Sequence, residues 1–117
     1  MNSAGPREPE INMLFGTAEH IRASALILAV GQAPMVRFRG DIRRLDVRPL
    51  TDDDMQRLLH DIMSDDVAHV LEKNGSVDFT HVVGKDECKF RCRVSKQQGQ
   101  FSLYARMLGQ ATDEASG

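Results

Sequence analysis

The strongest constraint on the fold comes from the last third of the chain, where apolar and polar residues alternate. The runs "CKFRCRV" (88–94) and "FSLYARM" (101–107) both place an apolar residue at every second position. Because successive side chains of a β-strand point to opposite faces, each run predicts a half-buried strand. The polar side of the first run is basic, with Lys89, Arg91 and Arg93. A sheet with one covered face and one charged face is therefore expected.

Further strands and a first helix are predicted upstream. Apolar residues recur at helical spacing over residues 10–21 and predict an amphipathic helix. The apolar run "ALILAV" (25–30) predicts a short strand buried on both sides. Two more short strands, "MVRFR" and "IRRLD", flank Gly40-Asp41, a dipeptide that favours a tight hairpin turn.

Two helices are expected in the middle of the chain. Thr51 followed by Asp54 is a variant of the capping box, and Ser64 is an N-cap residue for a second helix that Asn74-Gly75 ends. A strand over 77–83 follows, again with period two. The predicted order is helix, three strands, two helices, three strands. This order indicates an α+β fold with a mostly antiparallel sheet of five to six strands and helices mainly on one face.

Length and charge limit the classes of function. The 117 residues, of which 27% are charged and 41% hydrophobic, fit one domain, predicted over 10–108, with flexible tails at 1–9 and 109–117. The second tail also reads as a truncated linker. The net charge of -2 makes nucleic-acid binding unlikely. No signal peptide and no apolar run of about 20 residues is present, so we expect a cytoplasmic location without membrane insertion.

No motif in the sequence indicates catalysis, a metal or a cofactor. Cys88 and Cys92 lie four residues apart on a predicted strand, or about 13 Å, which is too far for a disulfide. The four histidines are scattered and complete no zinc site. Gly84-Lys85 lacks the remaining residues of a Walker A loop, and no nucleophile elbow occurs. We therefore expect a protein that is not an enzyme and uses no cofactor.

Three blocks of the sequence, "ASALILAVGQAPMVRFRGDIRRLDVRPLT", "NGSVDFTH" and "KFRCRVSKQQGQFSLYARML", carry a family pattern in a fixed order. They resemble the amino-terminal domain of the PilT-like motor ATPases of type IV pilus retraction, pilus assembly and type II secretion. The positions that match the pattern of this family are Ala23, Ser24, Gly31, Pro34, Met35, Arg37, Gly40, Leu50, Thr51, Gly75, Asp78, Phe79, Phe90, Arg91 and Arg106.

The sequence also departs from this family. Ala25 and Ile27 stand where the family has Asp and His, Lys89 replaces the first arginine of the Arg-Phe-Arg motif, and Arg93 replaces an asparagine. The RecA-like ATPase half, with its Walker motifs, does not follow in this chain. The first two replacements remove the family's polar contacts from the strand at 25–30.

The resemblance implies a PAS-like domain that does not hydrolyse nucleotide itself. In the family such a domain packs against an ATPase domain, and its arginines approach the nucleotide at that seam. Carried over by position, Arg37, Arg91 and Arg106 are the candidates for partner or nucleotide contacts, and Arg39 and Arg93 extend the basic surface. A solvated strand face with no other role is the simpler interpretation of the same arginines.

Three functions remain open from the sequence. The first is a non-catalytic interaction module that docks on a PilT-like motor ATPase or self-associates. The second is a PAS-like sensor that binds a small ligand between the sheet and the helices. The third and weakest is nucleic-acid binding through the arginines, for which stacking partners are scarce, since aromatic residues make up 5% of the chain.

Overall fold

The computed structural model describes residues 10–84 and 87–109, and the predicted order of helices and strands is confirmed. The predicted tails lie outside these residues except for Gly109, which ends the last strand. Lys85, which follows Gly84 in the segment that lacks a Walker A pattern, also lies outside them. The elements are α1 (Ile11–His20), β1 (Ala25–Ala29), β2 (Met35–Phe38), β3 (Asp41–Arg44), α2 (Asp52–His60), α3 (Asp65–Asn74), β4 (Ser76–Val83), β5 (Cys88–Gln97) and β6 (Gln100–Gly109).

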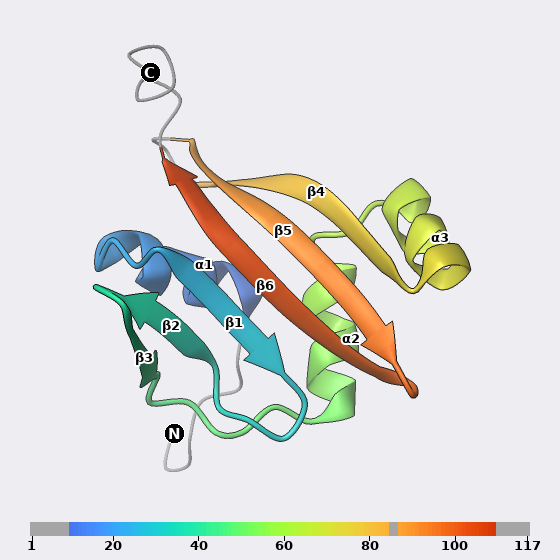
Figure 1. Ribbon diagram of the computed structural model, residues 1–117, viewed down its shortest axis with the longest axis horizontal. Coiled ribbons are helices and arrows are strands. Elements are labelled where there is room, and N and C mark those ends of the chain that lie inside the picture. Colours follow the sequence, from blue (N-terminus) through green and yellow to red (C-terminus); the bar gives the residue numbers. More distant parts are fainter. Residues whose placement is uncertain (1–9, 85–86, 110–117) are drawn as a thin grey trace, which may run out of the picture.

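The six strands form one antiparallel sheet in the order β3-β2-β1-β6-β5-β4 (Figure 1). β1 lies between β2 and β6, so the first and the last strands of the chain are neighbours at the centre. β4, β5 and β6 form a meander of long strands, whereas β2 and β3 form a short hairpin. The α+β fold with a six-stranded antiparallel sheet agrees with the sequence prediction.

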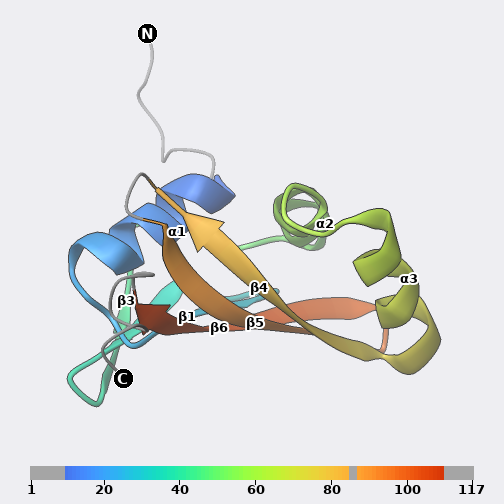
Figure 2. The ribbon, with the colours of Figure 1, turned by 90° about the horizontal axis from the view of Figure 1, so that it is seen from above.

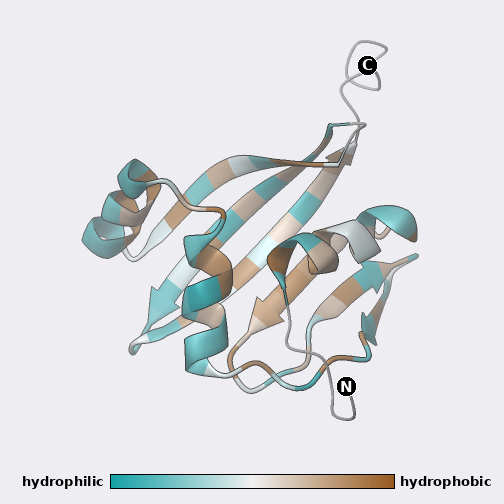
Figure 3. Cartoon of the chain, turned by 180° about the vertical axis from the view of Figure 1, so that it is seen from behind, coloured by the Kyte–Doolittle hydropathy of each residue, from teal (hydrophilic) through white to brown (hydrophobic). Residues whose placement is uncertain are grey.

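All three helices lie on the same side of the sheet (Figure 2). Seen from the helical side, apolar segments occur both in the helices and in the strands, the two layers that bound the space between them (Figure 3). The hydrophobic core fills this space, and removing each large apolar side chain from water contributes about 1.5–3 kcal/mol. Its largest fully buried side chains are Phe15, Phe90, Leu14, Leu26, Leu28, Leu50, Met55, Leu58, Leu59, Leu71, Leu103 and Val36.

The helix ends follow the local signals of the sequence. The hydroxyl of Thr51 accepts a hydrogen bond from the backbone N–H of Asp54, whose carboxylate accepts one from the N–H of Thr51. This reciprocal pair is the predicted capping box. Ser64 caps α3 with a single hydrogen bond, which its hydroxyl accepts from the N–H of Val67, and Gly75, with φ of 83°, ends α3 in the left-handed conformation.

Two local predictions were wrong. The strand at 25–30 is not buried on both sides: Leu26 and Leu28 face the helices, but Ile27 is half-exposed on the other face. The first hairpin turns at Arg39-Gly40 and not at Gly40-Asp41, because Phe38 pairs with Asp41. Both turn residues have positive φ, 53° and 84°, which is the geometry of a tight two-residue hairpin that matches the twist of the strands.

Candidate docking face

The sheet face opposite the helices, here called the open face, carries a row of arginines that crosses four strands. In an antiparallel sheet, paired residues of neighbouring strands lie on the same face. Ala25 of β1 pairs with Arg37 of β2 on one side and with Arg106 of β6 on the other. Arg106 pairs in turn with Arg91 of β5. Three of the predicted site residues therefore form one row, and all three are exposed.

A second row lies beside the first on the open face. Asp78 pairs with Arg93, Arg93 with Tyr104, and Tyr104 with Ile27 of β1. Asp78 is the one carboxylate that the described strands place on this face, which makes the face strongly basic in a chain of net charge -2. The cations of the open face are Arg37, Arg44, Lys89, Arg91, Arg93 and Arg106.

The arginines of the open face differ in how their charge is balanced. Nε of Arg93 lies 3.0 Å from Oδ1 of Asp78, and a nitrogen of Arg91 lies 3.8 Å from Oδ2 of the same carboxylate. These pairs are exposed and contribute little to stability. In the described part of the chain, the side chains of Arg37 and Arg106 have neither a hydrogen bond nor an ion pair. Their charges remain available to a partner.

The side chains of Arg37 and Arg106 are separated only by the small side chain of Ala25. Two strand spacings set their Cα atoms about 10 Å apart, which is within the combined reach of two guanidinium groups. Guanidinium groups bind carboxylate and phosphate oxygens with two parallel hydrogen bonds. This part of the open face is suited to bind a single anion between two strands.

Arg39, the fifth predicted residue, is separated from the others. It lies in the turn, outside the alternation of β2, and its guanidinium carbon lies 5.2 Å from the ring centroid of Phe38. Arg43 approaches the same ring at the same distance. Phe38 alternates with Arg37 and so lies on the opposite side of the sheet. The arginines of the hairpin are thus divided between the two faces.

Sequence reasoning placed Lys89 on the basic side of its strand but did not single out Arg44. Lys89 pairs with Val82, and Arg44 pairs with Met35, so both lie on the open face. Alternation within β5 predicts the side of Lys89, but it does not show that the face stays uncovered. Four of the five large exposed apolar side chains also lie there: Ile42, Val82, Tyr104 and Leu108.

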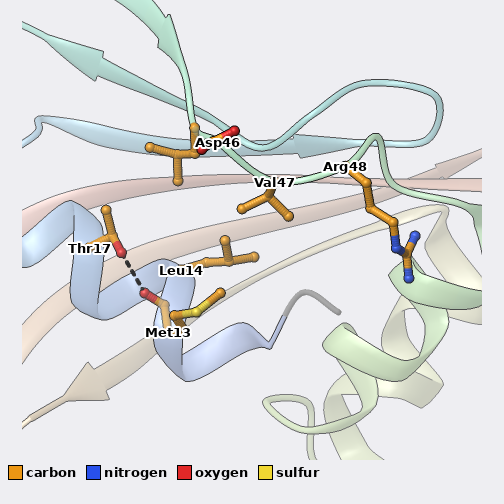
Figure 4. A pocket seen from close by; sticks show the side chains of 7 residues that line it. Met13, Leu14, Thr17, Asp46, Val47 and Arg48 are labelled. Carbon is orange, nitrogen blue, oxygen red and sulfur yellow. Dashed lines mark hydrogen bonds between the residues drawn. The ribbon is translucent and has the colours of Figure 1, made fainter. Parts of the chain in front are cut away.

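A groove on the helical side was not predicted (Figure 4). It lies between α1 and the segment that follows β3, has a volume of about 710 Å³ and is lined mainly by Met13, Leu14, Leu45 and Val47. Two of its polar side chains are already engaged. The hydroxyl of Thr17 donates to the carbonyl of Met13 at 2.9 Å, and Arg48 binds Asp54.

The two cysteines of the sequence belong to the hydrophobic core. Cys88 and Cys92 are buried free thiols, and burial raises the pKa of Cys92 to about 12. Among the residues that the structure describes, no three His, Cys, Asp or Glu side chains are grouped to hold a metal ion. Within the same residues, the helices are too short and too polar to cross a membrane.

Comparisons with known proteins identify relatives of this chain, although no family model matches it. The type IV pilus retraction ATPase PilT of Pseudomonas aeruginosa is 38% identical over 74 residues, which are 63% of this chain and 22% of that protein. A crystal structure of the pilus retraction motor PilT with bound ADP matches 85% of this chain with a TM-score of 0.76 and 35% identity. The match covers 29% of that motor chain.

Solved structures of lower identity share the fold. The ATPase DotB of Legionella pneumophila matches 90% of this chain with a TM-score of 0.71 and 14% identity, and the match covers 31% of DotB. This chain thus spans between a fifth and a third of the relatives that it matches. The family resemblance of the sequence motifs is confirmed: this chain is homologous to one region of the PilT-like motor ATPases.

Proposed function

We propose that this chain is a non-catalytic docking module, whose open face binds a subunit of a PilT-like motor ATPase or a second copy of the same domain. The observation that carries this proposal is the exposed row of Arg37, Arg106 and Arg91 on the sheet face that the helices leave uncovered. The similarity to PilT supports a motor subunit as the partner.

The composition of the open face is more typical of a protein–protein interface than of a surface that only contacts water. Protein interfaces are enriched in arginine and aromatic residues and surround a few apolar anchors with polar groups. Tyr104 lies beside Arg93 at the centre of the face and is 40% exposed, and Ile42 lies beside Arg37. A partner that covers these side chains gains apolar contact together with ion pairs.

The arginines define the chemistry of the partner surface. Arg37, Arg91 and Arg106 would meet carboxylates or phosphate oxygens of the neighbouring subunit, and Arg93 would extend that contact. PilT itself has been crystallised with ADP, so a bound nucleotide at the seam is one source of the phosphate. Arg39 would act at the edge of the contact. In this proposal the module works in the cytoplasm as part of a pilus or secretion motor.

Binding to a defined motor tests the proposal directly. The affinity of this chain for PilT of Pseudomonas aeruginosa would be measured by biolayer interferometry at about 50 and about 150 mM salt, and self-association by light scattering. We expect a complex or an oligomer that weakens as the salt rises. No binding and no self-association at either salt concentration would exclude the proposal.

A matched pair of charge reversals assigns the binding to the open face. Arg37→Glu is expected to weaken the interaction about tenfold or more, because it replaces an attraction by a repulsion at the contact. Arg43→Glu makes the same charge change on the same hairpin but on the other face, and should leave the affinity within about twofold. Equal losses in both variants would mean that binding follows net charge and not the open face.

The groove beside α1 favours a second function, the binding of a small apolar ligand. The space between the sheet and the helices is filled by buried side chains in the described residues, so a ligand would occupy this lateral groove. A thermal-shift screen of metabolites and nucleotides tests this: a ligand of the groove should raise the melting temperature of the wild type but not of Leu45→Arg. A flat screen would remove this candidate.

A further inference from the structure

The outer edge of β4 has the features of a site for an added strand. In the part of the chain that the structure describes, β4 (Ser76–Val83) is the last strand on its side of the sheet and pairs only with β5. Its eight residues extend over about 26 Å. The register with β5 is regular along its whole length, without a bulge that would bend the edge away.

The backbone of β4 offers a regular series of hydrogen-bonding groups to this edge. The N–H of Lys96 donates to the carbonyl of Gly75 at 2.9 Å, which sets the phase of the ladder with β5. In an antiparallel pair, alternate residues turn their N–H and C=O groups toward and away from the neighbour. Ser76, Asp78 and Thr80 therefore direct these groups outward, where the described residues provide no backbone partner.

The two edges of the sheet differ in how they are protected. β3, at the opposite edge, has only four residues, and its Arg43 and Arg44 are exposed cations of the kind that prevent edge-to-edge pairing. β4 is twice as long and contains neither proline, lysine nor arginine. Its one charged residue, Asp78, is neutralised by Arg93. The β4 edge is therefore left competent for pairing.

A groove of about 510 Å³ accompanies the first half of this edge. α3 flanks β4 there (Figure 1) and forms the other wall. The lining includes three valines, Val67 and Val70 of α3 and Val77 of β4, and Val70 is 38% exposed although it is a large apolar residue. Asp66 lies at the groove and has no ion pair in the described part of the chain.

We propose that an extended peptide of a partner protein binds between α3 and β4 by adding a strand to the β4 edge. The backbone of Ser76, Asp78 and Thr80 would hold the peptide, an apolar side chain would contact the valines, and a lysine or arginine would pair with Asp66. This mode of recognition combines main-chain hydrogen bonds for affinity with a side-chain groove for selectivity. Because α3 closes the far side of the groove, one extended chain fits there better than the edge of a second sheet.

The probe for this site is an acetylated and amidated peptide of ten residues, in which valine alternates with threonine and one central valine is replaced by lysine, so that the lysine lies on the same face as the remaining valines. Its binding to this chain would be followed by NMR titration and by amide hydrogen exchange. We expect the outward amides of Ser76, Asp78 and Thr80 to exchange at least about tenfold more slowly with the peptide bound. The amides of Val77 and Phe79, which face β5, should be slow from the start.

A proline tests the edge itself. Thr80→Pro removes an outward N–H and leaves the ladder with β5 intact, because proline is accepted on edge strands where its nitrogen faces solvent. We expect the variant to lose peptide binding while Thr80→Val, which keeps the N–H, retains it. If Thr80→Pro lowers the melting temperature strongly, Val70→Lys replaces it, since this exposed side chain blocks the groove without disturbing the core. A peptide that binds to both Val70→Lys and the wild type equally would overturn the proposal.

A charge exchange tests the role of Asp66. Asp66→Lys should weaken the binding of the lysine peptide and strengthen the binding of a peptide with glutamate at the same position. The preference of the protein between the two peptides is then reversed. No preference in either protein would remove the ion pair from the proposal. If the wild type does not bind the lysine peptide, or if it forms a dimer that Thr80→Pro disrupts, the occupant of this edge is not an extended peptide of a partner protein. Arg37→Glu should not change this binding, which separates it from docking by the open face.

Discussion

Arg48 and Asp54 form an ion pair that joins the segment after β3 to the first turn of α2. Nη2 of Arg48 donates to Oδ1 of Asp54 at 3.0 Å, and the side chain of Asp54 is only 7% exposed. The hydrogen bond from Arg48 is the main reason that the pKa of Asp54 is held well below 3.8, and bonds from Thr51 add to it, although burial acts in the opposite direction. One carboxylate thus serves both as helix cap and as counter-ion.

Replacing this carboxylate should destabilise the fold. Asp54→Asn removes the charge that balances Arg48 and weakens the cap of α2, so we expect the free energy of unfolding to fall by about 1–3 kcal/mol in urea denaturation. Asp53→Asn is the matched control, because Asp53 is an exposed acid in the same turn. Its cost should stay below about 1 kcal/mol. Equal losses would mean that the ion pair does not contribute.

The same pair makes the fold sensitive to acid. Since the pKa of Asp54 is lower in the folded protein than in the unfolded chain, its contribution is complete above pH 3.8 and is lost as the pH falls toward the folded pKa. The wild type should therefore lose stability below about pH 4 more steeply than Asp54→Asn. Parallel curves of unfolding free energy against pH would contradict this assignment.

His81 should cause a second loss of stability at mildly acidic pH. Its ring lies 4.9 Å from that of Phe15, its Nε2 has no hydrogen-bond partner among the described residues, and burial lowers its pKa from 6.5. The unfolded chain then takes up a proton more readily, so stability is complete above pH 6.5 and falls below it. His81→Phe keeps the packing and should flatten this part of the curve, whereas His69→Phe at an exposed position should not.

The two cysteines should be unreactive in the folded protein. Both thiols are buried, and burial raises the pKa of Cys92, so thiolate is scarce at neutral pH. Ellman's reagent should label no thiol rapidly in the native protein and two thiols after denaturation, because the chain has two cysteines. Rapid labelling of the native protein would show that the β5 face opens to solvent.

Two substitutions of glycine by alanine should change the stability of the fold in opposite directions. Among residues 10–84 and 87–109, a Cβ at either Gly16 or Gly40 meets no atom within 4 Å, so steric contact decides neither case. Gly40 has φ of 84° in the first hairpin, and Gly40→Ala should cost about 1 kcal/mol. Gly16 lies inside α1, where alanine is the better helix former, and Gly16→Ala should stabilise by about 0.5–1 kcal/mol. Melting temperatures that shift in the same direction would contradict this.

The fold was predictable where local signals decide the structure. Alternation fixed the inward residues of β5 and β6, and the cap residues Thr51 and Gly75 set the ends of α2 and α3. The position of the first turn was missed because Arg39 is an unusual residue at positive φ, so Gly40-Asp41 looked the better turn. The predicted turn was displaced by one residue, because Phe38 pairs with Asp41 and places the turn at Arg39-Gly40.

The arrangement of the candidate site was harder to predict from the sequence, because it depends on the order of the strands in the sheet. Arg37 and Arg106 are far apart in the sequence and share a row only because β1 lies between β2 and β6. The β4 edge and the groove beside α3 depend on which strand has no outer neighbour. The local pattern of residues predicts neither the shared row of arginines nor the unpaired edge of β4.

The central position of β1, between β2 and β6, has a consequence for how the chain reaches its native state. The hairpin of β2 and β3 and the meander of β4 to β6 close through short loops, but the contact between β1 and β6 joins segments from the two ends of the domain. Such long-range closure slows folding, to milliseconds or longer in domains of this kind. During synthesis, β1 gains its second neighbour only after β6 has been made, so we expect the pairing of β1 with β6 to form late in folding.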